Sequence, residues 1–250
     1  MNRRALSARS SPALRSVRKP LQILVTCGPT REPLDPVRFI SNRSTGTLGI
    51  ELARTFAARG HRVVLAAGPI DLPKDLGPRV RVERFETARE LHRLALKEFK
   101  HCDAVCMTAA VADFRPAVQS AAKIKRGKSA LTVRLIPNPD ILADLGRRKR
   151  PGQVLVGFAV ESSQVEARAK AKLIKKKLDL IVAQRIGGSA NPFGQVPMST
   201  TLIGRLGEKP QVSGAVTARK IASFSAITKP ALAVRIASFV EDFPCKSFNI

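Results

Sequence analysis

The chain contains neither tryptophan nor tyrosine, and its aromatic side chains are 11 phenylalanines among 250 residues. Modules that bind single-stranded nucleic acid stack bases on interleaved aromatic side chains, so this scarcity argues against such a module. The sequence also lacks any run of about 18 or more apolar residues, the length that a membrane-spanning helix needs. We therefore expect no membrane span, while a hydrophobic content of 44% suffices for one sizeable core.

Cysteine and histidine are also few. The four cysteines are Cys27, Cys102, Cys106 and Cys245. They form no CxxC pair, and three of them lie in or beside apolar strand-like segments, so we interpret them as reduced, buried thiols of a cytoplasmic protein. The three histidines stand apart without the spacing of metal ligands, which argues against a histidine metal site.

Acidic residues are scarce as well: 19 Asp and Glu oppose 44 Lys and Arg, for a formal net charge of +25. This charge favours polyanionic partners, namely nucleic acid, anionic membranes or phosphorylated small molecules. Residues 1–20 are basic, contain no acid and lack the apolar centre of a secretory signal. We interpret them as a disordered tail, although an organelle transit peptide or an over-long start also fits, and residues 21–245 as a single domain.

Short apolar, β-rich runs alternate with helical patterns along the chain. Strands are predicted at 21–26, 61–67, 80–85, 104–109, 131–135, 153–159, 178–183 and 199–204. Helices are predicted at 46–59, 87–99, 139–149, 162–176 and around 230–241, with Asn138 as the cap and Pro139 as the first residue of the third. This order predicts an α/β fold with a Rossmann-like, doubly wound, mostly parallel sheet flanked by helices.

Ligands of such a sheet bind at the carboxyl ends of its strands. The first loop there, residues 27–49, ends in Ser44, Thr45 and Gly46 at a helix start, where hydroxyls and backbone N–H groups can hold a phosphate. An ordinary helix cap explains the same residues, and the loop contains neither a GxGxxG fingerprint nor a P-loop. The amide of Asn42 can donate to a developing oxyanion or can simply stabilise a turn.

Later loops carry further polar candidates. Asp113 follows a strand end with small residues and can bind a sugar hydroxyl, a base amine or a metal, unless Arg115 pairs with it. The lysine-rich residues 121–128 suit either a mobile clamp over a triphosphate or a solvated surface loop. Phe158 can stack on a base or pack in the core, and helix capping alone explains residues 136–142. Taken singly, these features indicate a nucleotide-binding α/β domain.

Taken together, the segments are much more specific. The chain contains, in this order, GPTREPLDPVRFISNRSTGTLG, AAVADFRP followed by KIK, NPDIL, VGFAVES and KLIKKKLDLIVA. This series resembles the phosphopantothenate–cysteine ligase family, as found in the second half of the bacterial bifunctional coenzyme A biosynthesis flavoprotein, and the match covers about residues 21–185. Over residues 186–241 the resemblance is looser, with Phe193 as a marker.

The resemblance implies a homodimer that condenses 4′-phosphopantothenate with L-cysteine. It implies a nucleoside triphosphate, CTP or ATP, with Mg²⁺ bound through the nucleotide phosphates, and no flavin. The substrate carboxylate attacks the α-phosphate, and the cysteine amine then displaces the nucleoside monophosphate. Since no flavin-binding half precedes residue 21, we expect a stand-alone ligase and a separate phosphopantothenoylcysteine decarboxylase in the same pathway.

The resemblance also assigns roles by matched position. Asn42 resembles the asparagine that orients the acyl group in the second step, Lys123 the flexible-loop lysine that stabilises phosphate charge during activation, and Asp113 an acid that contacts the nucleotide. The other positions that we predict to bind nucleotide are Gly28, Ser44, Thr45, Gly46, Ala109, Ala110, Lys123, Pro139, Asp140, Ile141, Leu142, Phe158, Lys172 and Lys176. The four-residue spacing of the last two lysines places both on one helix face.

Two other functions remain as alternatives. A nicotinamide-dependent reductase needs a glycine fingerprint after the first strand, where this chain has Gly28 and Pro29, and the short-chain type needs a tyrosine. A nucleic-acid-binding α/β protein without catalysis is suggested by the charge alone. The chain also departs from many bacterial ligases, with Thr47-Leu48 in place of Lys-Met and Gln184-Arg185 in place of an Asn-Asp pair.

Overall fold

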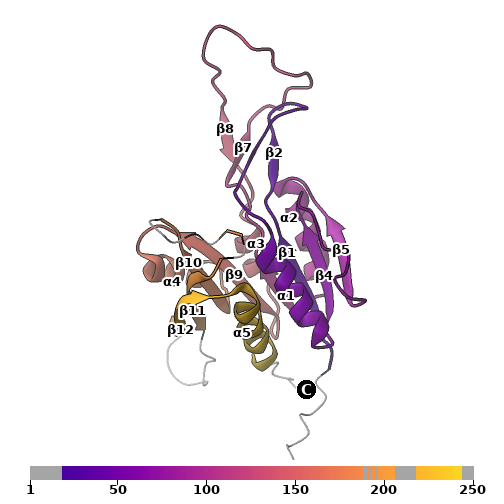
Figure 1. The fold of residues 1–250 in the computed structure, drawn as a ribbon, viewed down its shortest axis with the longest axis vertical. Coiled ribbons are helices and arrows are strands. Elements are labelled where there is room, and N and C mark those ends of the chain that lie inside the picture. The colour runs from indigo at the N-terminus through magenta and orange to yellow at the C-terminus, as the bar shows by residue number, and fades with distance from the viewer. Residues whose placement is uncertain (1–18, 188–190, 192, 195, 206–217, 244–250) are drawn as a thin grey trace, which may run out of the picture.

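The computed structural model describes residues 19–187, 191, 193–194, 196–205 and 218–243. They form a central eight-stranded sheet (Figure 1). From edge to edge its strands are β12 (Ala218–Ile227), β11 (Met198–Arg205), β10 (Leu180–Arg185), β9 (Val154–Glu161), β6 (Ala104–Met107), β1 (Gln22–Cys27), β4 (Arg62–Ala67) and β5 (Val80–Arg84). The six strands from β10 to β5 pair in parallel, whereas β11 and β12 run antiparallel. The predicted mostly parallel sheet is confirmed.

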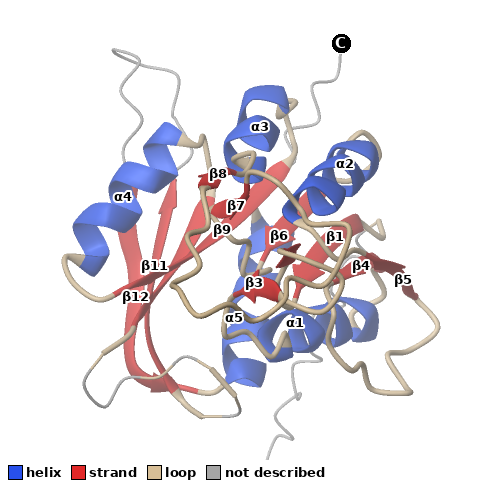
Figure 2. Cartoon of the chain, turned by 90° about the horizontal axis from the view of Figure 1, so that it is seen from above, coloured by secondary structure: helices blue, strands red, loops and turns tan. Residues whose placement is uncertain are grey.

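Helices cover both faces of this sheet, as the view from above shows (Figure 2). On one face lie α1 (Thr47–Ala58) and α5 (Lys229–Asp242), and on the other lie α2 (Ala88–Phe99), α3 (Ile141–Arg148) and α4 (Val165–Lys175). A hydrophobic core lies on each face of the sheet, and alternate residues of β1 point into the two cores. Ile23 and Val25 belong to the core under α1 and α5, and Leu24 belongs to the core under the other three helices. The doubly wound arrangement is therefore confirmed.

Four short strands leave the body and form what we call the arm, residues 31–41 and 114–137 (Figure 1). The arm consists of two antiparallel pairs, β2 (Arg31–Pro33) with β3 (Phe39–Ser41) and β7 (Phe114–Pro116) with β8 (Leu135–Pro137). The sequence did not predict it, because strands of three residues carry no readable periodicity. The predicted strand at 131–135 is mostly loop, and only its last residue belongs to β8.

The two halves of the arm are tied together by Asp35, whose side chain is buried. Its carboxylate accepts hydrogen bonds from the Arg38 guanidinium and from the backbone N–H of Ile124, the latter at 3.1 Å. Arg38 in turn donates to the Ile124 carbonyl at 2.7 Å. The hydrogen bond from Arg38 holds the pKa of Asp35 far below its usual range. The lysine-rich loop is thus fixed to the β2–β3 turn at Ile124.

The predicted boundaries need one correction at α3. The helix begins at Ile141, and its cap is Asp140, whose carboxylate accepts from the Ala143 N–H at 3.1 Å. Asn138 is not the cap; its amide donates to the Ala112 carbonyl at 2.9 Å. Asp140 competes better because a charged oxygen suits the positive end of a helix. The other four predicted helices are confirmed within a few residues.

Two predictions concern the chain as a whole, namely the absence of a membrane span and the basic tail. Among the described residues, no helix combines the length and the apolar character that crossing a membrane requires. The basic tail was predicted for residues 1–20, of which 1–18 lie outside the part of the chain that the structure describes. The tail and the single domain at 21–245 stay predictions.

Candidate active site

A cavity of about 690 Å³ opens at the carboxyl ends of β6, β9 and β10, beside the first turn of α1. It brings together segments that are far apart in the sequence. All the predicted site residues except Gly28 and Lys123 line it: Asn42, Ser44, Thr45, Gly46, Ala109, Ala110, Asp113, Pro139, Asp140, Ile141, Leu142, Phe158, Lys172 and Lys176. The topology therefore gathers the predicted residues at one place, as the strand-end rule requires.

The first turn of α1 forms one wall of the cavity. Gly46 precedes the helix with φ +70°, a conformation that disfavours side chains, and no side chain caps the helix there. The first backbone N–H groups of a helix have no acceptor within it, so those of Thr47, Leu48 and Gly49 are available at the cavity wall. Gly28 lies behind Gly46: a Cβ on Gly46 would stand 3.1 Å from the Gly28 nitrogen. Gly28 supports the wall instead of lining it.

A Gly49→Val variant is expected to lose both stability and nucleotide binding. A Cβ at Gly49 would lie 2.6 Å from Thr108 Oγ1 and 3.0 Å from the Thr26 carbonyl, so α1 would have to move away from the sheet. Overpacking of this kind costs about 1–3 kcal/mol or more. Thermal unfolding and calorimetric titration with nucleotide would measure both losses. Gly127→Val is a control for the loss of a glycine, since like Gly49 it has no positive φ, and the nearest atom to a Cβ there lies 4.0 Å away. Normal nucleotide affinity in Gly49→Val would contradict the close approach of α1.

Asn42 stands at the mouth of the cavity, between the arm and α1. Its side-chain amide donates to the Ala110 carbonyl at 3.1 Å. Ala110 is itself fixed, because its N–H donates to the Gly28 carbonyl at 2.9 Å. The Asn42 side chain is exposed apart from this contact, so its second amide hydrogen can reach a bound group.

Asp113 lines the cavity and is exposed, and no ion pair to it occurs among the described residues. The alternative that Arg115 pairs with it is wrong. The Arg115 guanidinium donates to the Pro137 carbonyl and to Asn138 Oδ1, the latter at 3.1 Å. The Asp113 carboxylate is therefore free to accept from a ligand hydroxyl or to bind a cation.

Lys172 and Lys176 both line the cavity from α4 and its end, as their spacing predicts. Each is held by an acid: Lys172 Nζ lies 2.5 Å from Glu161, and Lys176 Nζ lies 2.9 Å from Asp140. Burial disfavours the ionised form of Glu161, but the hydrogen bonds from Lys172 and Arg168 outweigh it and lower its pKa. These pairs orient the ammonium groups at the wall.

The position of Phe158 agrees with both interpretations, packing in the core and contact with a ligand. It is half-buried against the core on the α1 and α5 face, and it also lines the cavity. Further residues that the sequence did not single out as ligands line the same cavity, among them Gln184, Phe193 and Lys229. Phe193 was noted as a family marker, and Lys229 lies at the start of the last helix, where a lysine gives no local signal of function.

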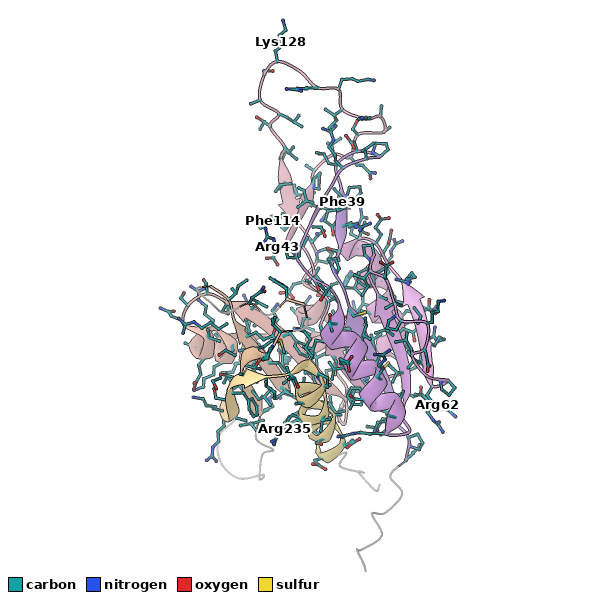
Figure 3. All side chains as sticks on the ribbon, in the orientation of Figure 1. Phe39, Arg43, Arg62, Phe114, Lys128 and Arg235 are labelled. Carbon is teal, nitrogen blue, oxygen red and sulfur yellow. The ribbon has the colours of Figure 1, made fainter. Side chains whose placement is uncertain are left out.

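Lys123 is the predicted residue that the structure does not bring to the cavity of its own chain. It is exposed on the arm, next to the Ile124 contact described above. Figure 3 shows how far the arm extends from the body, with Lys128 near its outer end. No group of three or more His, Cys, Asp or Glu side chains that could hold a metal ion occurs among the described residues.

Comparison with known proteins assigns the family. The family described as DNA/pantothenate metabolism flavoprotein C-terminal domain matches residues 19–228. The Bacillus subtilis coenzyme A biosynthesis bifunctional protein CoaBC is 39% identical over 189 residues, which are 75% of this chain and 46% of that protein. A protein of an unidentified prokaryote, named cysteine/cysteine sulfinic acid decarboxylase, is 40% identical over 188 residues, 74% of this chain and 52% of that protein. The chain thus spans about half the length of these curated relatives.

A solved structure agrees with the sequence comparison. The crystal structure of the C-terminal domain of a coenzyme A biosynthesis bifunctional protein CoaBC superposes with a TM-score of 0.70 at 28% identity. The match covers 92% of this chain and 98% of that domain, so the likeness extends over the whole fold and is not confined to the nucleotide-binding motifs. The chain belongs to the DNA/pantothenate metabolism flavoprotein C-terminal domain family, and the resemblance read from its motifs is confirmed.

Proposed function

We propose that this protein is a phosphopantothenate–cysteine ligase that uses CTP or ATP. The proposal rests on one observation: an uncapped helix N-terminus, two oriented lysines and Asn42 converge in the same cavity. A helix N-terminus and lysines are suited to phosphates. A reductase needs a glycine fingerprint for its dinucleotide, and a nucleic-acid module needs no enclosed site, so neither alternative accounts for this combination.

The reaction places two demands on the site. In the first step a carboxylate oxygen of 4′-phosphopantothenate bonds to the α-phosphorus, the bond from that phosphorus to the bridging oxygen breaks, and pyrophosphate leaves with the electron pair. In the second step the cysteine nitrogen bonds to the acyl carbon, the nucleoside monophosphate leaves, and the nitrogen loses a proton. The site must therefore hold phosphates first and a polarised acyl oxygen second.

Different residues meet these two requirements. The N–H groups of the first α1 turn and the Lys172 and Lys176 ammonium groups bind phosphate oxygens, and Pro139 to Leu142 border the base. Asp113 is the free carboxylate, and hard oxygen ligands of this kind suit Mg²⁺ carried in on the phosphates. When bound there, Mg²⁺ would neutralise phosphate charge. Asn42 donates to the acyl oxygen from its fixed position on Ala110.

We also propose that the protein acts as a homodimer that is formed through the arm. Seven large apolar side chains of the arm are exposed: Val37, Phe39, Ile40, Phe114, Val118, Leu131 and Leu135. Phe39 and Phe114 both lie near the base of the arm, above the body (Figure 3). Exposed apolar patches of this kind mark interfaces, and a second copy of the chain would bury them. An arm that docks on a partner also carries Lys123 away from its own cavity and toward the partner's.

The first test of the function is pyrophosphate release by purified protein with Mg²⁺, 4′-phosphopantothenate, cysteine and either CTP or ATP. We expect release that requires phosphopantothenate, and the preferred nucleotide identifies the base. A folded protein that releases no pyrophosphate with either nucleotide would refute the proposal.

An Asn42→Asp variant is expected to slow amide formation by about 10²–10³-fold, the usual cost of losing an oxyanion donor, and to retain most of the first step. A carboxylate cannot donate to the Ala110 carbonyl or to an acyl oxygen. Pyrophosphate release without cysteine measures the first step, and formation of the amide product measures the second. Equal losses in both steps would contradict a role that is specific to the second.

A further inference from the structure

One corner of the cavity lies where β10 ends and α5 begins. Lys229 is the first residue of α5 and lines the cavity, although only 4% of it is exposed. Its ammonium group donates to the Gly194 carbonyl. Gln184, at the end of β10, and Phe193 line the same corner.

The charge of Lys229 is uncompensated, unlike that of the two lysines from α4. No carboxylate forms an ion pair with it among the described residues, and residues 186–205 contain no Asp or Glu at all. Burial disfavours the charged form of Lys229 and lowers its pKa. A buried cation without a carboxylate is costly, so the position calls for an anion from outside the chain.

The Gln184 amide at this corner lacks a good partner, and so does the hydroxyl of Thr200, its neighbour on the next strand, which does not itself line the cavity. Gln184 and Thr200 are direct neighbours across the antiparallel β10–β11 pair, so their side chains point to the same face of the sheet, the face that α1 and α5 cover. Thr200 is 1% exposed, and its hydroxyl has no hydrogen-bond partner among the described residues. Among the described residues the Gln184 amide donates only to the Met198 sulfur, a weak acceptor. Buried polar groups are rarely left unpaired, so the Gln184 amide, which lines the cavity, is available to a bound group.

The rest of the cavity indicates which anion this corner takes. In the proposed function the base lies against α3 and the connection before it, and the acyl group lies at Asn42, toward the arm. The first turn of α1 lies between them and suits the α-phosphate. The corner at Lys229 is on the face of the sheet opposite to α3, and it adjoins the end of β10, two strands away from β6, after which Ala110 holds Asn42. These assignments leave two phosphate groups of the substrates without a site, the β,γ-diphosphate of the nucleotide and the 4′-phosphate of phosphopantothenate. The β- and γ-phosphates are bonded to the α-phosphate at the α1 turn, whereas the 4′-phosphate lies at the far end of the pantothenoyl chain from the acyl group, so the corner beside α1 and α5 suits the β- and γ-phosphates better.

We propose that Lys229, with Gln184, binds the β- and γ-phosphates of the nucleotide, the group that leaves as pyrophosphate. This inference rests on the proposed function, because it requires a nucleoside triphosphate as substrate. Negative charge builds on the β-phosphate while its bond to the α-phosphorus breaks, and a buried ammonium group stabilises that charge more than an exposed one does. The subsite therefore serves both binding and the departure of pyrophosphate.

The test compares ligands that differ only in these two phosphates. Lys229→Met is expected to weaken binding of CTP and of inorganic pyrophosphate by about 10–100-fold, the size of a lost charged hydrogen bond, and to leave CMP affinity unchanged. Calorimetric titration with Mg²⁺ measures all three, with ATP and AMP as the pair if the wild type prefers them. Lys229→Arg should recover part of the affinity for pyrophosphate. Lys175→Met, on the exposed face of α4, is the control for a general loss of positive charge.

A second variant guards against misfolding. Gln184→Met replaces a cavity-lining side chain with one of similar length. Among the described residues the Gln184 amide donates to the Met198 sulfur alone, so we expect the variant to fold like the wild type and still to bind pyrophosphate more weakly. If CTP and CMP lose equal affinity in Lys229→Met, or if both variants bind pyrophosphate like the wild type, the subsite is refuted while the ligase remains. If the wild type binds neither triphosphate and releases no pyrophosphate, the proposed function itself fails.

Discussion

A Lys123→Gln variant is expected to fold normally and to slow nucleotidyl transfer by about 10²–10³-fold. Its side chain is exposed on the arm, so its removal takes nothing from the core. In the proposed reaction its ammonium group stabilises phosphate charge in the first step, and a lost electrostatic contact to a transition state has a cost of this size. The rate of phosphopantothenate-dependent pyrophosphate release measures the effect.

Lys128→Gln is the matched control, because it removes the same charge from an exposed residue of the same loop, farther out along the arm (Figure 3). We expect it to keep nearly wild-type activity. If both variants, or neither, lose activity, the role assigned to Lys123 is wrong, since general electrostatic attraction would then explain the result.

Mixed dimers test whether Lys123 acts on the partner's cavity. Lys123→Gln and Asn42→Asp subunits are each inactive in the complete reaction on their own. If Lys123 serves the partner, a mixed dimer contains one intact site, built from the Asn42 of one subunit and the Lys123 of the other. Random mixing in equal amounts should then restore about a quarter of wild-type amide formation, since half of the dimers are mixed and each has one working site. No recovery would place Lys123 at its own cavity after movement of the loop.

An Asp179→Ala variant is expected to lose about 3–5 kcal/mol of unfolding free energy. Asp179 is 2% exposed and joins three elements at the end of the sheet opposite to the cavity. Its carboxylate accepts from Lys149 Nζ at 2.7 Å and from the Leu155 N–H at 2.7 Å. Its removal leaves the largely buried Lys149 ammonium and the Leu155 N–H without this acceptor. Chemical denaturation followed by circular dichroism measures the loss.

Two controls separate this pair from the loss of an acid in general. Asp71→Ala removes an exposed acid and is expected to change stability by less than about 0.5 kcal/mol. In the double variant Asp179→Leu with Lys149→Met, both charges are replaced by apolar groups of similar size, and it should recover most of the loss. A single Asp179→Ala variant as stable as Asp71→Ala would show that the buried pair contributes little.

The arm and the cap of α3 show where sequence reasoning failed. The β-strands of the arm have three residues each and are ordered by contacts such as that of Asp35 with Ile124, 89 residues away in the sequence. No local pattern encodes such a contact. The strand β12 was missed for another reason: it is an edge strand whose residues are mostly exposed, so it lacks the apolar run that marks the buried strands.

The sequence by itself determined the parallel sheet, the helices on both of its faces and most of the site. Helices and strands bury apolar side chains at regular spacings, so a short stretch of sequence is enough to predict them. The motifs identified Asn42, the start of α1 and the lysines of α4 as site residues. Because ligands of such a sheet bind at the carboxyl ends of its strands, these residues were expected to lie together, as they do. Only the tertiary structure decided which residues share a wall. It placed Lys123 on the arm and Gly28 behind Gly46, and it brought Lys229 and Gln184 to the wall of one cavity, because such contacts depend on how the chain returns across the sheet.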